Sequence, residues 1–131
     1  MNRLVARFRD GRTTKGRSTD FSPGKESFSM MAPEDPGQVT RVIVEDLKAL
    51  FFVRGFVGDS THDARKSFST TPPGSGKKLR VTFKDGEVFQ GTTQAYHPDE
   101  PGFFLIPADP DSNTIRAFIV NSSVEKVEEI S

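Results

Sequence analysis

The sequence predicts an all-β fold, built from two tandem five-stranded small β-barrels that an internal repeat relates. Residues 79–83 alternate apolar and polar side chains, and this period of two is typical of a strand with one buried face. Asp85-Gly86 follows, a pair that favours a two-residue hairpin turn and would place Phe83 opposite Val88. Residues 4–16 show the same design in the first half of the chain.

The repeat runs along most of both halves. Gly16 and Gly91 occupy matching places inside a strand, where glycine predicts a bulge or a sharp bend. A self-match of this length is not expected by chance, and it decides the architecture before any single element does. The clearest pairs, first half before second, are Leu4 with Leu79, Phe8 with Phe83, Asp10-Gly11 with Asp85-Gly86, Phe21 with Tyr96, Pro23 with Pro98, and Phe28 with Phe103.

The first barrel is expected at residues 1–57. Residues 45–47 are expected to form a short turn or a 3₁₀ step before the last strand. That strand is apolar on both faces at residues 50–53, and such strands are usually buried on both, so we expect it where the two barrels meet. The five strands are expected at residues 3–9, 12–21, 27–31, 39–44 and 48–54, separated by turns that contain Pro, Gly and Asp.

A connector is expected at residues 58–77, because Gly58-Asp59 opens this segment and a Pro- and Gly-rich run closes it. It is either an ordered arm that places Phe68 in a groove or a flexible linker, and its polar composition favours the linker. The second barrel is expected at residues 78–131, with its strands at residues 79–84, 87–96, 103–106, 114–120 and 124–130.

Composition limits the setting of the protein. Two units of about 50 residues are marginal on their own, so we expect the barrels to pack together. The 12 Phe residues and the absence of Trp indicate that Phe fills both cores. The sequence contains no Cys, which fits a reducing compartment. The N-terminus shows no secretory signal and the longest apolar run is residues 49–53, so we expect a cytoplasmic protein without a membrane partner.

The net charge is zero, but the charges are unevenly distributed. Residues 1–25 and 65–84 are basic, whereas residues 26–64 and 85–131 are acidic. Either each barrel opens with a basic strand that pairs with acidic ones across the sheet, or the basic strands bind an anionic ligand. Cross-strand pairing is favoured, since a neutral domain lacks the usual footprint of a nucleic-acid binder. The candidate anion-binding residues are Arg3, Arg7, Arg9, Lys78, Arg80 and Lys84.

No catalytic, cofactor or metal site is expected from the sequence, and neither is an enzyme. The two histidines, His62 and His97, lack partners at zinc-ligand spacing. The carboxylates of Asp99-Glu100 and Asp109-x-Asp111 lie in Pro-rich turns without a predicted enclosing cleft. Ser122-Ser123 has no base nearby in the sequence, and residues 73–78 lack the spacing of a phosphate-binding loop.

The second hairpin resembles the first motif of the Sm-like proteins, a resemblance that implies an SH3-like or Sm-like small barrel. The two positions at which the Sm motif binds RNA through Asp and Asn hold His97 and Pro101 here, and Ser22 and Glu26 in the first copy. RNA binding in the Sm manner is therefore not implied. The resemblance rests on Leu79, Val81, Phe83, Asp85-Gly86, Val88, Gly91 and Tyr96.

The whole chain also resembles an uncharacterised bacterial family of tandem hairpins that sometimes occurs beside PilZ domains, which implies a signalling or motility context. Arg3-x-x-x-Arg7 followed by residues 20–24 is similar to the PilZ signature for cyclic di-GMP. Two arginines on one strand face could bind phosphates bidentately. The PilZ signature has a longer gap between its two parts, and the internal repeat also explains residues 20–24.

The sequence does not define a biochemical activity. The leading hypothesis is a non-enzymatic adaptor that binds a protein partner through an exposed groove or sheet edge, with no cofactor. The alternative is a module that uses the basic hairpin strands to bind an anionic ligand, either single-stranded RNA or a cyclic dinucleotide. The two hypotheses differ in salt response, because phosphate contacts weaken steeply with salt.

Overall fold

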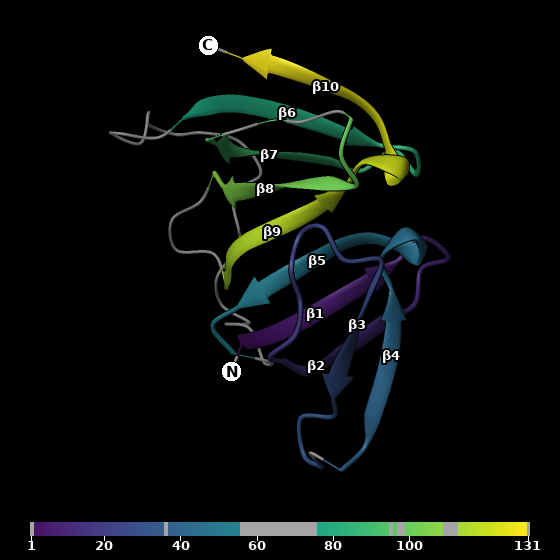
Figure 1. Ribbon diagram of the computed structural model, residues 1–131. Helices are drawn as coiled ribbons and strands as arrows, with labels where there is room; N and C mark the ends of the chain where they lie inside the picture. The colour runs from purple at the N-terminus through teal and green to yellow at the C-terminus, as the bar shows by residue number, and fades with distance from the viewer. Residues whose placement is uncertain are drawn as a thin grey trace.

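The described part of the chain folds into ten strands and two short 3₁₀ helices (Figure 1). The computed structural model describes residues 2–130 apart from residues 36, 56–75, 95, 97–98 and 109–112. Most of the expected connector, with His62 and Phe68, therefore lies outside the described residues, as do His97, Asp109 and Asp111. The elements are β1 (Asn2–Phe8), β2 (Thr13–Ser18), β3 (Ser27–Met31), β4 (Val39–Ile43), η1 (Val44–Asp46), β5 (Leu47–Val53), β6 (Lys77–Phe83), β7 (Val88–Thr93), β8 (Gly102–Pro107), β9 (Thr114–Val120), η2 (Asn121–Ser123) and β10 (Val124–Ile130).

All ten strands belong to one antiparallel sheet with the order β10-β6-β7-β8-β9-β5-β1-β2-β3-β4. Figure 1 shows two halves, one above the other, with β5 and β9 side by side where they meet. At this junction Leu50 faces Phe118, and Phe51 faces Ala117. The all-β prediction is confirmed, and so is the expectation that the last strand of the first half lies between the two halves.

The sheet stays open at both ends, so the pairing does not show two closed barrels. β5 is bonded to β1 on one side and to β9 on the other. A strand has only two hydrogen-bonding edges, so β9 leaves none on β5 for β4. β4 and β10 are consequently the two edges of the ten-stranded sheet, and each is bonded to a single described strand, β3 and β6 respectively.

The structure repeats the register of one half in the other. Leu4 pairs with Gly16, and the matching Leu79 pairs with Gly91. The aromatic contacts repeat as well: the ring centroids of Phe21 and Phe28 lie 5.0 Å apart at 77°. Those of Tyr96 and Phe103 lie 4.8 Å apart at the same angle. The internal repeat is thus structural and not only a similarity of sequence.

β5 and β10 are equivalent strands by this repeat, down to a shared irregularity. The pairing of β5 with β1 shifts between Ala49 and Leu47, which leaves Lys48 as an extra residue. The pairing of β10 with β6 shifts in the same way and leaves Glu125 as the extra residue. Lys48 and Glu125 therefore occupy one position of the repeat with opposite charges.

The hairpin turns are one residue longer than the sequence predicts. The backbone N–H of Phe83 donates to the carbonyl of Glu87 at 2.8 Å, and Val88 pairs with Thr82 rather than with Phe83. In this turn the residue with a positive φ is Gly86, at +95°, whereas a two-residue type I′ turn also needs one at Asp85. A three-residue turn that ends in glycine avoids this strain, so the expected register of Phe83 is wrong.

The glycines inside β2 and β7 mark places where the next strand comes very close. A Cβ atom at Gly91 would clash with the carbonyl oxygen of Ile106, and one at Gly16 would clash with that of Met31. Any side chain at either position would push the neighbouring strand away. The pairings of β2 with β1 and of β7 with β6 run through these glycines without a register shift, so the predicted bulge is not found there, and close approach is the physical reason for glycine.

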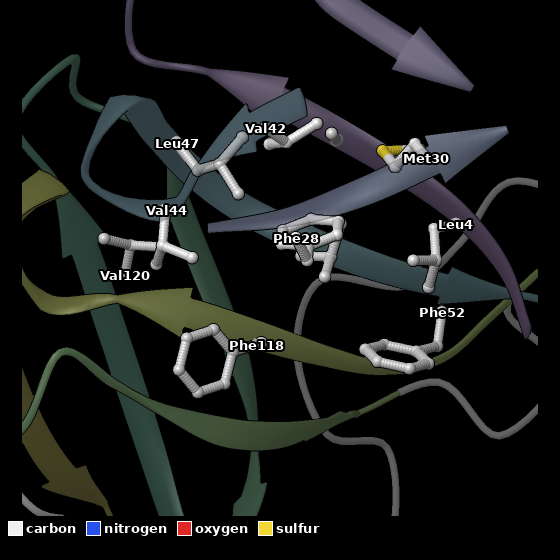
Figure 2. Packing of buried hydrophobic residues seen from close by; sticks show 11 residues of the cluster. Leu4, Phe28, Met30, Val42, Val44, Leu47, Phe52, Phe118 and Val120 are labelled. Carbon is white, nitrogen blue, oxygen red and sulfur yellow. The ribbon is translucent and has the colours of Figure 1, made fainter. Parts of the chain in front are cut away.

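Two apolar clusters form the core, and β5 supplies residues to both. Leu50 and Phe52 point into the first cluster, whereas Ala49 and Phe51 pack in the second. The second half also contributes to the first cluster, because Phe118 and Val120 of β9 lie in it (Figure 2). Packing across the junction is thus shared, which fits the expectation that units this small do not stand alone.

Candidate functional site: the cleft at the junction and the free sheet edges

A buried lysine joins the two halves beside the β5–β9 junction. The side chain of Lys48 is about 11% exposed, and its Nζ lies 2.7 Å from Asp85 Oδ2 and 2.5 Å from Glu87 Oε1. The same nitrogen lies 4.7 Å from the centroid of the Phe83 ring. Arg7 adds a longer ion pair with Glu87 at 3.6 Å. The hydrogen bond from Lys48 lowers the pKa of Asp85 most, followed by that from the backbone N–H of Glu87.

Two further polar contacts hold the junction at its ends. Asn113 Nδ2 donates to the carbonyl of Gly55 at 2.8 Å, and Gly55 N–H donates to Asn113 Oδ1 at 3.2 Å. At the other end, Ser123 Oγ donates to the carbonyl of Lys48 at 2.8 Å. No local sequence pattern predicts these contacts, because each joins residues at least 58 positions apart.

The two hairpin turns enclose a cleft of about 480 Å³ with charges of both signs. Arg9 and Lys84, two of the candidate anion-binding residues, lie on its wall. The carboxylates of Asp10 and Asp85 lie on the same wall, and Asp85 already holds Lys48. The cleft therefore presents two exposed cations beside two acids, instead of a uniformly positive surface.

The other candidate anion-binding residues are spread over both halves. The side chain of Arg3 donates a hydrogen bond to the carbonyl of Arg54 at 3.0 Å, just after the end of β5. Arg80 lies 3.9 Å from Glu128 on the neighbouring strand, an example of the cross-strand pairing expected from the charge pattern. Lys78 lies on β6 with Arg80, and it also has a bonding partner. The structure thus brings Arg9 and Lys84 together in one cleft, with Arg7 beside it, but not the whole set.

A larger open groove of about 610 Å³ lies between the loops of the two halves. Its wall carries Asp99 and Glu100, together with Glu26 and Glu45 of the first half. Ser122 also lines the groove, and its Oγ has no hydrogen-bond partner among the described residues. Both histidines of the sequence lie outside the described residues, and no described side chain bonds to that hydroxyl.

β4 is the more apolar of the two free edges. Val39 is 59% exposed and Ile43 is 45% exposed, which makes them two of the five large exposed apolar side chains that the structure describes. Arg41 lies between them on the same face, since side chains two apart on a strand share a face. Arg41 is exposed and forms no ion pair with another described residue.

β10 is the acidic edge. Its sequence between Val124 and Ile130 holds four charged residues, three of them glutamates. Glu128 pairs with Lys126 at 3.5 Å, whereas Glu125 and Glu129 are exposed and pair with no other described residue. The two edges of the sheet are therefore complementary in charge.

The described residues contain no group of three or more His, Cys, Asp or Glu side chains arranged to hold a metal ion. No helix among them is long and apolar enough to cross a bilayer, since both helices are single 3₁₀ turns. A family model that carries the description "Family of unknown function (DUF6982)" matches residues 1–131. Comparison with curated proteins gave no match, and neither did comparison with solved structures.

Proposed function

The chain belongs to this family of unknown function, and we propose that it is a non-enzymatic interaction module that binds a protein partner as an added strand along β4. Added strands bond to the free N–H and C=O groups of an edge, while side-chain contacts give specificity. Each half serves as a strongly bent small barrel of the SH3-like or Sm-like kind, open on one side. The module works in the cytoplasm, in a signalling or motility pathway.

The observation that carries this proposal is the surface of β4. An exposed apolar edge strand is a template for pairing with another chain, and proteins usually protect such edges with charge or cover them. Val39 and Ile43 stay exposed on β4, and the cation between them, Arg41, pairs with no other described residue. Arg41 can reach acidic residues on the two diagonals of a partner strand.

A displayed peptide library selected on the full chain tests this proposal. We expect peptides that alternate acidic and apolar residues, and we expect Arg41→Glu to abolish their binding. Lys84→Glu makes a similar charge reversal in the cleft between the hairpin turns and should leave peptide binding unchanged. Selected peptides that bind Arg41→Glu and the original chain equally well would contradict the proposal.

The same two variants test the alternative, an anionic ligand in the cleft. The observation that favours it is the position of Arg9 and Lys84 on one wall. Binding of single-stranded RNA or a cyclic dinucleotide would fall steeply with salt and would be lost in Lys84→Glu. No such binding at low salt would eliminate the alternative.

A further inference from the structure

We propose that the partner strand on β4 is β10 of a second copy of this chain, so that copies join head to tail. This inference rests on the proposed function of β4 as a strand-binding edge. The template for the joint is already inside the molecule, because β5 of the first half pairs with β9 of the second. By the repeat, β4 is equivalent to β9, and β10 is equivalent to β5. The two free edges are therefore equivalent to the two strands that pair inside the molecule.

The register of the internal joint transfers directly to the free edges. Leu50 faces Phe118 inside the molecule. The equivalent of Leu50 is Val127, and the equivalent of Phe118 is Arg41, because Phe28 faces Val42 on β4 as Phe103 faces Ile119 on β9. Val127 of one copy would therefore lie opposite Arg41 of the next.

This register places the unpaired charges of the two edges together. Continuing the antiparallel register from Val127 opposite Arg41 puts Glu129 opposite Val39 and Glu125 opposite Ile43. Arg41 then lies between two glutamates on its diagonals, within reach of a long side chain. These three charged residues are those that pair with no other described residue at the free edges.

A second ion pair of the internal joint has a counterpart with reversed signs. Inside the molecule, Lys48 of β5 holds Glu87 of the second hairpin. The equivalents at the free edges are Glu125 on β10 and Arg12 in the first hairpin, which has the same three-residue turn. The second joint would thus bring Glu125 to Arg12, which within its own chain pairs with Asp10 at 2.7 Å.

The proposed joint is weaker than the internal one. At the internal joint Phe118 is buried, whereas its counterpart Arg41 is exposed. The apolar Phe51 of β5 corresponds to Glu128 on β10. The joint between copies is therefore electrostatic and reversible, and salt weakens it. Because it joins unlike surfaces, repeated joining gives a closed ring or an open filament.

Sedimentation of the full chain over a wide range of concentration tests the inference. We expect association at low salt that weakens as salt is added. Arg41→Glu should weaken association about tenfold or more, and so should the double variant Glu125→Arg with Glu129→Arg. Lys84→Glu carries a similar change of charge at a residue that belongs to neither edge strand, and it should associate as the original chain does. Matching thermal unfolding curves would show that each variant is folded.

Mixing the two weakly associating variants gives the sharpest result. The unchanged β10 of Arg41→Glu can then bind the unchanged β4 of the double variant, and the new carboxylate on β4 would face the two new arginines, so association should return. A chain that stays monomeric at every concentration at low salt would overturn the inference, and so would association that Arg41→Glu does not change. In either case, acidic peptides that still need Arg41 would leave the proposed function standing, and their absence would remove both.

Discussion

β5 and β10 hold the same position in two copies of one fold, yet one lies in the middle of the sheet and the other at its edge. β5 carries a single charged residue, Lys48, and its other six side chains are apolar. β10 carries four charged residues among its seven. The repeat fixes the path of both strands, so their side chains and not their backbones decide whether a neighbour covers them.

The largest effect is expected where the two joints differ most in burial. Phe118 of β9 is buried, and its ring lies 5.3 Å from those of Phe21 and Phe104. Phe118→Ala should cost about 3–5 kcal/mol of unfolding free energy in urea denaturation, because it leaves a cavity. At the equivalent position on β4, Arg41→Ala should change that free energy by no more than about 0.5 kcal/mol. Similar losses for both would show that β4 is covered in the monomer.

The next largest effect on stability is expected at the extra residue of each irregular pairing, Lys48 on β5 and Glu125 on β10. Lys48→Met should lower the unfolding free energy by about 1–2 kcal/mol, because Asp85 loses its cation and Glu87 keeps only its longer pair with Arg7, while both carboxylates are partly exposed to water. Glu125→Gln on β10 should stay within about 0.5 kcal/mol at a concentration where the chain is monomeric. If the two variants were equally destabilised, the ion pairs of Lys48 would not explain its burial.

The hydroxyl that bonds to the backbone of β5 gives a smaller effect. Ser123→Ala removes the hydrogen bond from Ser123 Oγ to the carbonyl of Lys48 and should cost about 1 kcal/mol in thermal or urea unfolding. Asp46 is the equivalent residue in the first half, and no described strand of a second half lies beside it as β5 lies beside Ser123. Asp46→Ala should therefore be nearly neutral, and a large loss there would mean that η1 is held in another way.

The smallest effect is the change of unfolding free energy with pH in the acidic range. The pKa of Asp85 is lowered in the folded chain, chiefly by Lys48, so its contribution is present above its unfolded pKa near 3.8. That contribution is lost as the pH falls through the lower, folded pKa. Asp20 behaves in the same way, but the backbone N–H of Ser29 is the main cause of its lowered pKa. In urea unfolding at a series of pH values, Lys48→Met should thus reduce the acid dependence due to Asp85 and leave that due to Asp20 unchanged.

The sequence was sufficient for the strands and for the repeat, because period-two patterns and glycine turns are local signals. It also placed the last strand of the first half between the halves, since only a strand covered on both faces can be apolar on both. It did not predict that β9 would take the second edge of β5, or that Lys48 would be buried. Both depend on residues far apart in the chain, and no local pattern records which distant carboxylate will neutralise a lysine.

The joint between β5 and β9 also has a consequence for how the chain is made. Ser123 and the Lys48 carbonyl that it binds lie 75 positions apart, so the ribosome completes β5 well before β9 exists. During that interval the first half has its hairpin, but the apolar residues of β5 that later face β9 are uncovered. Local hairpins form quickly and distant pairings late. Synthesis therefore passes through a stage in which an aggregation-prone strand is exposed, and a pause or truncation before β9 would prolong it.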